Sequence, residues 1–467
     1  MSSSPSPPHV LLVSAPLQGH VNPLLVLGRR LASRGLLVTF STVPHAGLKF
    51  PHGDGASVAV GRGTLRFEHL RGGSLWAPDD PRYGGFVVDS IIGHLVDAAS
   101  EALAGLIGRQ SAAGRPVSCV VASAFVPWAV RVASGMGIPQ ALLWTESCAV
   151  LSLFFYQHFH SLPEFPSDEA APVVVPGLPP MAAGDLPSLI RAPEQFIWRQ
   201  VLVADLRSLR ETVSWLLVNT FDELERPAIQ TLRSRLGRLA VTPVGPLLET
   251  AEEDEHHGGH AGDDCMAWLD AQPRRSVVFV AFGSIMKLGR DEMAELAAGL
   301  AATGRPFLLV VRDNDDNNRE LLLLPDQPDD DCLAAATGGK VVAWCDQARV
   351  LSHAAVGCFL THCGWNSAVE ALASGVPVVT YPAWADQPTN AKFLEDVYGV
   401  GVRLPKPIAR DALRRCVEEV MSGPKAAAMR ATAGKWKDEA SAALATGGSS
   451  ERGIQDFVDA VLCTAVN

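Results

Sequence analysis

The chain has 467 residues, of which 48% are hydrophobic, and its formal net charge at pH 7 is −11. This length predicts two or three domains of roughly 150 residues each. The acidic balance, without a basic stripe, argues against nucleic acid or an anionic membrane as the partner.

The nine cysteines are an odd number without paired spacing, which indicates free thiols in a reducing compartment. The opening MSSSPSPPHV lacks the positively charged region of a secretory signal. The sequence contains no run of 18 apolar residues, so no membrane span is predicted. We therefore expect a cytoplasmic chain without stable membrane insertion, working as a monomer.

The N-terminal half opens with the pattern of a strand, a helix and a strand. Residues 10–14 are a buried strand, Asn22 can cap a helix with Pro23 at its first position, and residues 36–41 form the second strand. The first loop then points to the carboxyl edge of the sheet and carries His20. An imidazole with an ordinary pKa near 6.5 can take a proton from a hydroxyl at neutral pH. A capping or core role is the alternative for His20.

Further strands of this half end in polar residues. Residues 117–122 are a buried strand that ends at Ser123, and the next strand end carries Thr145 and Glu146. Residues 151–200 are rich in aromatic residues and proline and are expected to form the wall of a binding pocket and a loop over it, although such clusters are also common in cores. Residues 215–219 and 241–244 are predicted to be the last strands of this half.

An acidic, glycine-containing stretch without periodicity, TAEEDEHHGGHAGDD over residues 250–264, is predicted to be an interdomain linker. Its three histidines could suggest a metal site, but nothing frames them rigidly, so a solvated linker is favoured and no metal is predicted. After it, residues 276–282 form an apolar strand that ends in Gly283-Ser284, before helix 291–302 and strand 306–312. The last predicted helices span residues 410–421, 426–443 and 454–463.

The most informative stretch runs from Trp344 to Gln387. Residues 356–361 are an apolar strand, a tight turn follows over 362–364, and a helix opens at Asn366-Ser367 and ends before Gly375. A helix N-terminus presents unpaired backbone N–H groups and a partial positive charge, which suit a phosphate. The next strand, 376–381, leads to an edge where ligands of open α/β sheets bind.

Polar and aromatic residues stand where a nucleotide-sugar would need them. Trp344 offers a face for a base, His362 lies by the helix start, and Glu370 can accept from two ribose hydroxyls. Each has an ordinary structural alternative, since Ser367 and Glu370 also make a capping box. Their joint pattern favours the binding site.

With its spacing, the pattern W-x-x-Q, H-C-G-W-N-S, E and D-Q resembles the signature box of plant UDP-dependent glycosyltransferases of secondary metabolism, and the rest of the chain is also similar. The resemblance implies an α/β fold of two doubly wound Rossmann-like domains facing a cleft, the GT-B arrangement. It implies an acceptor domain over residues 1–249, the linker over 250–264, and a UDP-sugar domain over 265–467 whose last helix, about 454–463, packs back on the N-terminal domain.

The resemblance also implies roles for individual residues. Trp344, with Cys345 beside it, would stack on uracil, Gln347 would contact the nucleoside, and Glu370 would hold the ribose. The diphosphate would be held by the turn and helix start, through His362, Trp365 (by its backbone), Asn366 and Ser367. The pair Asp386 and Gln387 would bind the sugar hydroxyls. Ser284 is a further diphosphate contact, Thr145 touches the donor sugar, and Gly19 belongs to the same site. Glutamine at position 387 is the family's usual sign of UDP-glucose, which is the expected co-substrate without a further cofactor.

Gln18-Gly19-His20 corresponds to the family's general base, but Ser123 stands where the family usually has the aspartate that orients this histidine. A hydroxyl cannot stabilise an imidazolium as a carboxylate does. Either Glu146 supplies the carboxylate, or the acceptor needs no strong base. A carboxylic acid is already ionised at pH 7, and the chain resembles most the branch that makes glucose esters of aromatic acids.

The expected activity is metal-independent, inverting transfer of glucose from UDP-glucose to a small aromatic acceptor, at a carboxylate or a phenol. Three alternatives remain open from the sequence. One is a C-glucosyltransferase acting on a phenolic, another is a catalytically impaired nucleotide-sugar-binding protein, and the third is a UDP-sugar epimerase of the same architecture.

Overall fold

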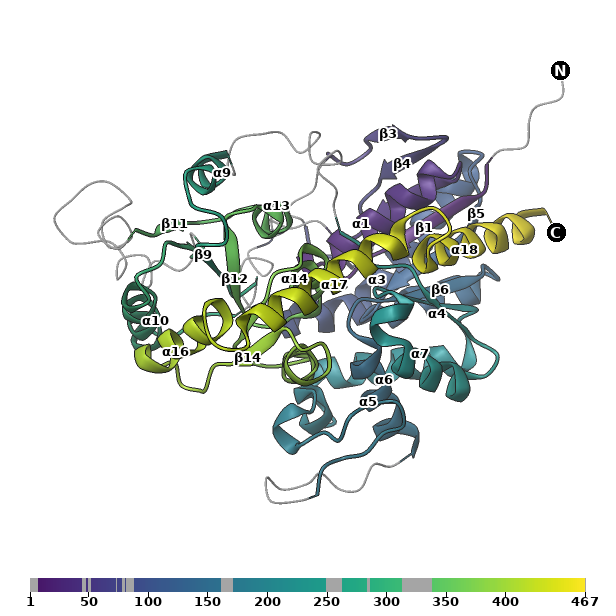
Figure 1. Cartoon of the computed structure of the whole chain (residues 1–467). Coiled ribbons are helices and arrows are strands. Elements are labelled where there is room, and N and C mark those ends of the chain that lie inside the picture. Colours follow the sequence, from purple (N-terminus) through teal and green to yellow (C-terminus); the bar gives the residue numbers. More distant parts are fainter. Residues whose placement is uncertain are drawn as a thin grey trace. The chain divides into compact units, whose positions relative to one another are not determined.

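The computed structural model describes residues 7–43, 48, 52–72, 74–77, 80, 88–160, 171–248, 263–283, 286–312 and 338–466. The chain divides into two compact units, and Figure 1 labels many of their elements. Unit 1 takes in Met1–Pro180, Leu189–Glu249 and Ala442–Asn467, and unit 2 takes in Met181–Ser188 and Thr250–Ser441. A short segment from the N-terminal half of the sequence, Met181–Ser188, therefore belongs to unit 2.

The described part of unit 1 contains an eight-stranded sheet in the order β3-β4-β2-β1-β5-β6-β7-β8. Only the edge strand β3 runs antiparallel to its neighbour, and the other pairs are parallel. Continuous apolar runs such as HVLLV suit parallel strands that are buried on both faces. The strands are β1 (His9–Val13), β2 (Leu37–Ser41), β3 (Ser57–Val60), β4 (Gly63–Phe67), β5 (Val117–Ser123), β6 (Gln140–Trp144), β7 (Trp215–Val218) and β8 (Ala240–Pro243).

Helices pack on this sheet and share its core. Ile454 and Phe457 of the last helix lie in the same buried cluster as strand residues Val10 and Val38, and this helix packs against β8 and α1. The helices of unit 1 are α1 (Gln18–Ser33), α3 (Val88–Ala112), α4 (Pro127–Gly135), α5 (Cys148–His160), α6 (Ile197–Glu211), α7 (Asp222–Leu236) and α18 (Ser449–Val466). The short turn η2 (Ser188–Arg191) begins at Ser188, which belongs to unit 2, and its other residues belong to unit 1.

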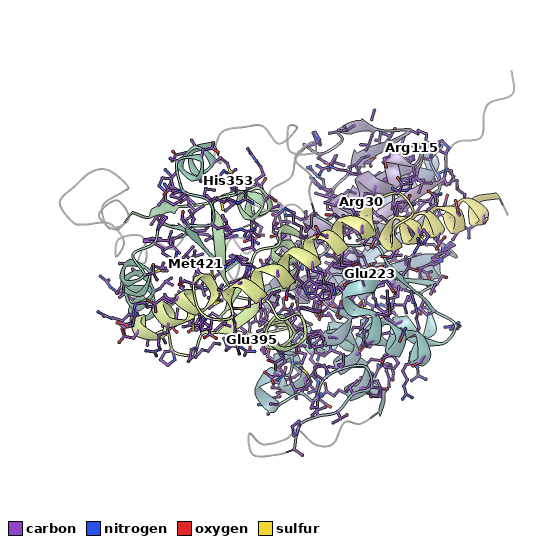
Figure 2. All side chains as sticks on the ribbon, in the orientation of Figure 1. Arg30, Arg115, Glu223, His353, Glu395 and Met421 are labelled. Atoms are coloured by element: carbon purple, nitrogen blue, oxygen red, sulfur yellow. The ribbon has the colours of Figure 1, made fainter. Side chains whose placement is uncertain are left out.

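Helix α1 begins earlier than its sequence signals predict. It starts at Gln18, so Asn22 does not cap it and Pro23 lies inside it. The expectation that His20 stands on the preceding loop is therefore wrong, because His20 lies in the first turn of the helix. The helix continues past Pro23 because its apolar face is buried, and Arg30, labelled in Figure 2, ties it to the sheet by donating to the carbonyl oxygen of Val244 at 3.3 Å.

Unit 2 contains a second sheet, of six described strands in the order β11-β10-β9-β12-β13-β14, and all its pairs are parallel. Both units thus have the doubly wound α/β organisation expected from the sequence. The strands are β9 (Val277–Ala281), β10 (Phe307–Val310), β11 (Lys340–Val342), β12 (Val356–Thr361), β13 (Val378–Thr380) and β14 (Gly401–Arg403).

The helices of unit 2 follow the predicted pattern closely around β12. Helix α14 (Trp365–Ser374) ends at Gly375, whose φ of 73° is the left-handed cap predicted from the sequence. The other helices are α9 (Asp263–Asp270), α10 (Arg290–Ala302), α13 (Gln347–Ser352), α15 (Gln387–Lys392), the π-helical turn η3 (Phe393–Val397), α16 (Arg410–Met421) and α17 (Ala426–Leu444), and the segment 181–188 forms the turn η1 (Ala183–Asp185). Most of the predicted linker lies outside the described residues, but its last two residues, Asp263 and Asp264, already belong to α9.

One described helix, within α3, is long and apolar enough to cross a membrane by length and composition alone. Half of its window, 50%, is buried inside the structure, as in the core helix of a globular unit.

All eight described cysteines are free thiols. Burial raises the pKa of the Cys119 and Cys358 thiols to about 12, so they are protonated at neutral pH.

Candidate active site

In unit 1, the candidate base His20 meets the carboxyl end of strand β6. Because β1, β5 and β6 are parallel neighbours, their ends lie at one edge of the sheet, and α1 starts at the same edge. Nδ1 of His20 lies 3.2 Å from Oγ1 of Thr145. With its proton on Nδ1, the ring donates to Thr145 and leaves the lone pair of Nε2 available to a substrate.

His20 has no carboxylate partner among the described residues, and Thr145 makes its one side-chain hydrogen bond there. Burial lowers the pKa of His20 to about 4, so the ring is neutral at pH 7. A neutral hydroxyl partner does not stabilise the imidazolium that proton transfer would create. His20 is therefore a positioned but weak base.

Neither of the two residues expected from the sequence to support His20 is bonded to it. The hydroxyl of Ser123 accepts from the backbone N–H of Ala15 at 2.9 Å and donates to the carbonyl of Ala124 at 3.1 Å. Ser123 therefore fixes the loop that leads into α1 and does not orient the imidazole directly. Glu146 follows Thr145 at the same strand end and is half-buried.

Phe125, which the sequence did not indicate as a site residue, packs against His20. The two rings are edge to face with centroids 5.7 Å apart. Phe125 has a left-handed backbone with a φ of 67°, which is costly for a residue with a Cβ. Its N–H donates to Oδ2 of Asp205 on α6 at 2.6 Å, so this fully buried carboxyl holds the turn that supports the imidazole.

The raised pKa of the buried Asp205 carboxyl leads us to expect a specific dependence of stability on pH. Burial raises the pKa of its carboxyl from 3.8 to about 8, against the opposing effects of the Phe125 hydrogen bond and Arg131. The folded chain therefore keeps a proton that the unfolded chain loses above about pH 4, so the free energy of unfolding falls as pH rises from about 4 to about 8. Asp205→Asn keeps an acceptor for the Phe125 N–H but does not titrate. The Tm of this variant should therefore rise relative to the Tm of the wild type as the pH increases from about 4 to about 8.

Melting curves at half-unit pH steps measure this difference. Asp205→Ala serves as the control, because it removes the acceptor for the Phe125 N–H and should lower Tm at every pH. A difference in Tm between Asp205→Asn and the wild type that stays constant with pH would contradict the assignment.

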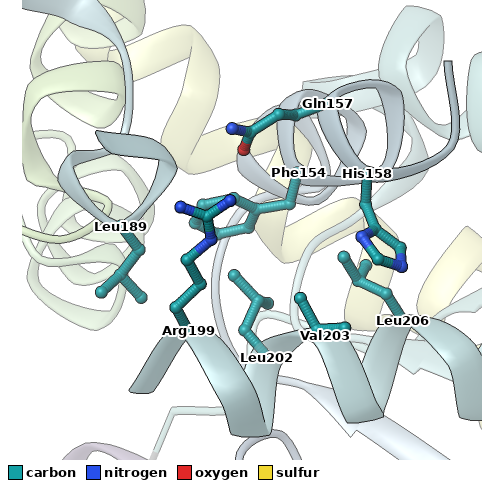
Figure 3. A pocket seen from close by; sticks show the side chains of 8 residues that line it. All are labelled: Phe154, Gln157, His158, Leu189, Arg199, Leu202, Val203 and Leu206. Carbon is teal, nitrogen blue, oxygen red and sulfur yellow. The ribbon is translucent and has the colours of Figure 1, made fainter. Parts of the chain in front are cut away.

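Unit 1 also contains a cavity of about 230 Å³ between α5 and α6. Figure 3 shows the Arg199 guanidinium pointing into it between Phe154 and Gln157. The pKa of His158 in its wall is lowered by partial burial and then by Arg207, Arg199 and Arg210, so the cavity lies in a positive local field. None of the candidate catalytic residues lines it. The lining residues are Phe154, Gln157, His158, Leu189, Arg199, Leu202, Val203 and Leu206.

In unit 2, His362 lies in the turn between β12 and α14 and is closely packed by two glycines. A Cβ added at Gly283 or at Gly364 would lie 2.6 Å from Nε2 of its ring. Burial lowers the pKa of His362 to about 4, so the imidazole is neutral at pH 7. It lies beside the N-terminus of α14, where backbone N–H groups and the helix dipole favour an anion.

The residues assigned to the nucleoside lie together in unit 2. Nε2 of Gln347 donates to Oγ of Ser367 at 2.8 Å and to Oε2 of Glu370. Trp344 precedes them in the sequence and has 42% of its surface exposed. Cys345 is buried, and burial raises the pKa of its thiol well above the usual range.

The sugar-binding candidates lie at the start of α15, where Asp386 is the residue before the helix and Gln387 is its first residue. Oε1 of Gln387 accepts from the backbone N–H groups of Ala383 at 2.8 Å and of Trp384 at 3.2 Å. Oδ2 of Asp386 accepts from the N–H of Trp365 at 3.1 Å and from Asn390.

Within the described part of the chain, Nε2 of Gln387 has no hydrogen-bond partner. Burial raises the pKa of Asp386 to about 6 despite its hydrogen bonds, so it is mainly ionised at pH 7. The backbone N–H of Trp365, which the resemblance assigns to the diphosphate, is donated to Asp386 in this structure.

The structure thus brings the donor-side residues of the signature box into one region of unit 2, and it brings His20, Ser123, Thr145 and Glu146 to one sheet edge of unit 1. Asn366 follows Trp365 in the first turn of α14, and Gly19 precedes His20 in α1. Ser284 lies outside the described residues. Within those residues, no group of three or more histidine, cysteine, aspartate or glutamate side chains could hold a metal ion. The individual roles of these residues stay predictions.

Comparison with known proteins adds independent findings. A family model described as UDP-glucoronosyl and UDP-glucosyl transferase matches residues 250–438. The chain is 40% identical over 477 residues to a gallate 1-beta-glucosyltransferase from Punica granatum, which covers 99% of this chain and 92% of that relative. It is 39% identical to a cinnamate beta-D-glucosyltransferase from Fragaria ananassa, with 97% of this chain and 82% of the relative covered.

Among solved structures, Os79 from O. sativa in complex with UDP is similar with a TM-score of 0.79 and 30% sequence identity, and the match covers 97% of this chain and all of that one, 100%. The likeness extends along nearly the whole length of this chain, so it includes both units. The chain therefore belongs to the UDP-glucoronosyl and UDP-glucosyl transferase family and is a UDP-glucosyltransferase with the GT-B fold.

Proposed function

We propose that this enzyme transfers glucose from UDP-glucose to the carboxylate of a small aromatic acid and forms a glucose ester with inversion at the anomeric carbon. The observation that carries the proposal is the environment of His20, a neutral imidazole bonded to the hydroxyl of Thr145. Such a base suits an acceptor that is already ionised. The relatives named for gallate and cinnamate glucosyl transfer support the same acceptor class.

The proposed step needs no proton removal from the acceptor. A carboxylate oxygen attacks the anomeric carbon of glucose, the bond from that carbon to the diphosphate oxygen breaks, and UDP leaves with the electron pair. Transfer to a phenol would also require the hydroxyl proton to pass to His20. Positioning alone can contribute a large part of the rate of such a displacement.

On the donor side, we assign the uracil to Trp344 and the ribose to Glu370, with Gln347 beside them. The diphosphate is assigned to the turn at His362 and the start of α14, and the glucose hydroxyls to Asp386 and Gln387. The charge that develops on the leaving diphosphate is then stabilised by the helix N-terminus and by a hydrogen bond from the neutral His362 ring.

We further propose that UDP-glucose is the only co-substrate besides the acceptor, that no metal is needed, and that the enzyme works as a monomer in the cytoplasm. The free thiols of the described cysteines and the acidic charge support this setting.

The test is to incubate the protein with UDP-glucose and a panel of aromatic acids and phenols, and to identify products by mass. We expect UDP release with aromatic acids and a product whose glucose is removed by mild alkali, as for an ester. Alkali-stable products from phenols alone would replace this proposal by O- or C-glucosylation. Loss of UDP-glucose without any acceptor would indicate an epimerase, and binding without turnover an impaired enzyme.

A further inference from the structure

The segment Met181–Ser188 comes from the N-terminal half of the sequence but belongs to unit 2. It touches the turn that carries Asp386 and Gln387. The N–H of Ser188 donates to the carbonyl oxygen of Ala385 at 2.9 Å, and the N–H of Ala385 donates to Oγ of Ser188 at 2.6 Å. Both backbone polar groups of Ala385 are therefore satisfied by a single serine.

Ala385 is the residue of this turn that most needs support. Its φ is 56°, in the left-handed region that residues with a Cβ adopt only at a cost. Asp386 follows directly, so the backbone direction at Ala385 decides where the next two side chains begin. A reciprocal pair of hydrogen bonds is the kind of constraint that keeps an unfavourable backbone conformation in place.

A second group of contacts fastens the same segment to α15 and β14. The hydroxyl of Thr389 donates to the carbonyl oxygen of Asp185 at 2.7 Å. The carboxylate of Asp185 lies 3.8 Å from Nζ of Lys392 and 3.7 Å from Nη2 of Arg403. Glu395, labelled in Figure 2, accepts from Nε of Arg403 at 2.5 Å and so holds this arginine from its other side.

We propose that Met181–Ser188 is a positioning element of the donor site, in which Ser188 holds Ala385 in its left-handed conformation and thereby sets Asp386 and Gln387 for the glucose hydroxyls. The inference rests on the proposed role of this pair in sugar binding. It assigns Ser188 no contact with the substrate. Discrimination among UDP-sugars then depends on a residue that lies 197 positions before Ala385 in the sequence.

The first experiment measures the binding of UDP and of UDP-glucose to Ser188→Ala by calorimetry, without an acceptor. The dissociation constant for UDP-glucose should rise about fivefold to tenfold, the effect of one lost hydrogen bond, while that for UDP stays within about twofold. Ser188→Thr keeps the hydroxyl and should bind as the wild type does. The matched control is Ser441→Ala, an exposed serine of unit 2 whose hydroxyl bonds only to its own helix at Lys437.

A second variant tests the mechanism. Adding Ala385→Gly to Ser188→Ala should restore most of the lost affinity, because glycine adopts the left-handed conformation without support. An equal weakening of UDP and UDP-glucose would overturn the proposal in favour of a general disturbance of unit 2, and so would unchanged affinities. Failure of the proposed function is distinguishable, since the wild type would then show no transfer to aromatic acids whatever Ser188→Ala does to binding.

Discussion

Replacing His20 by alanine is expected to lower kcat/KM for phenolic acceptors by about 10²- to 10⁴-fold, the usual contribution of a general base. For aromatic carboxylates the loss should be much smaller, because their acceptor oxygen is already ionised at pH 7 and only positioning is lost. The measurement compares initial rates of wild type and His20→Ala with a matched pair of acceptors, a hydroxybenzene and the corresponding benzoic acid.

The hydrogen bond between His20 and Thr145 supplies the control for this comparison. Thr145→Val removes the partner of Nδ1 but leaves the ring, so it should reduce transfer to phenols less than His20→Ala does. Because the pKa of His20 is about 4, the ring stays unprotonated from pH 8 down to about pH 5. Protonation of His20 should therefore not lower the rate with phenols within that range. Equal losses with both acceptor types would remove the reason for favouring acids.

Replacing His362 by alanine should lower kcat/KM for UDP-glucose by about 10²-fold or more, comparable to the loss of one donor to a developing negative charge. The ring lies at the N-terminus of α14 and is neutral at pH 7 in this structure. A nearby diphosphate favours the protonated ring and so raises its pKa, because it is an anion. UDP should therefore bind more tightly to the wild type at pH 5 than at pH 8, and this difference should shrink in His362→Ala.

The two glycines around His362 allow the position of the ring to be tested separately from its chemistry. Gly364 caps α14 with a φ of −57°, which alanine adopts easily, but the Cβ of Gly364→Ala would lie 2.6 Å from Nε2. This variant keeps the imidazole and displaces it, so the affinity for UDP should fall toward that of His362→Ala. Titrations with UDP at both pH values measure this, and a Gly364→Ala enzyme with unchanged affinity would show that the ring position is not critical.

Much of unit 2 around the signature box can be predicted because its signals are local. The apolar run of β12 and Gly375 at the helix end determine strand, turn and helix within twenty residues. Local signals are weaker in unit 1. The edge strand β3 and its neighbour β4 are short and only partly buried, so no continuous apolar run indicates them. At α1, the cap signal of Asn22 and Pro23 loses to the burial of the helix face, which carries the helix back to Gln18.

The contacts that define the candidate site join residues far apart in the chain. His20 and Thr145 are separated by 125 positions, and Ala385 and Ser188 by 197. A family resemblance can mark one partner of each pair, but the second partner depends on the order of strands in the sheet and on the path of a loop. For this reason the sequence indicates neither the contact between His20 and Thr145 nor any part for Phe125, Asp205 and Ser188.

The placement of α18 bears on how the protein is made. Its buried residues, Ile454, Phe457, Val458 and Val461, belong to the core of unit 1. All of unit 2, which ends at Ser441, is synthesised before them. Domains usually fold in the order of synthesis, but here the nascent N-terminal unit must wait with part of its apolar surface uncovered until α18 has been synthesised.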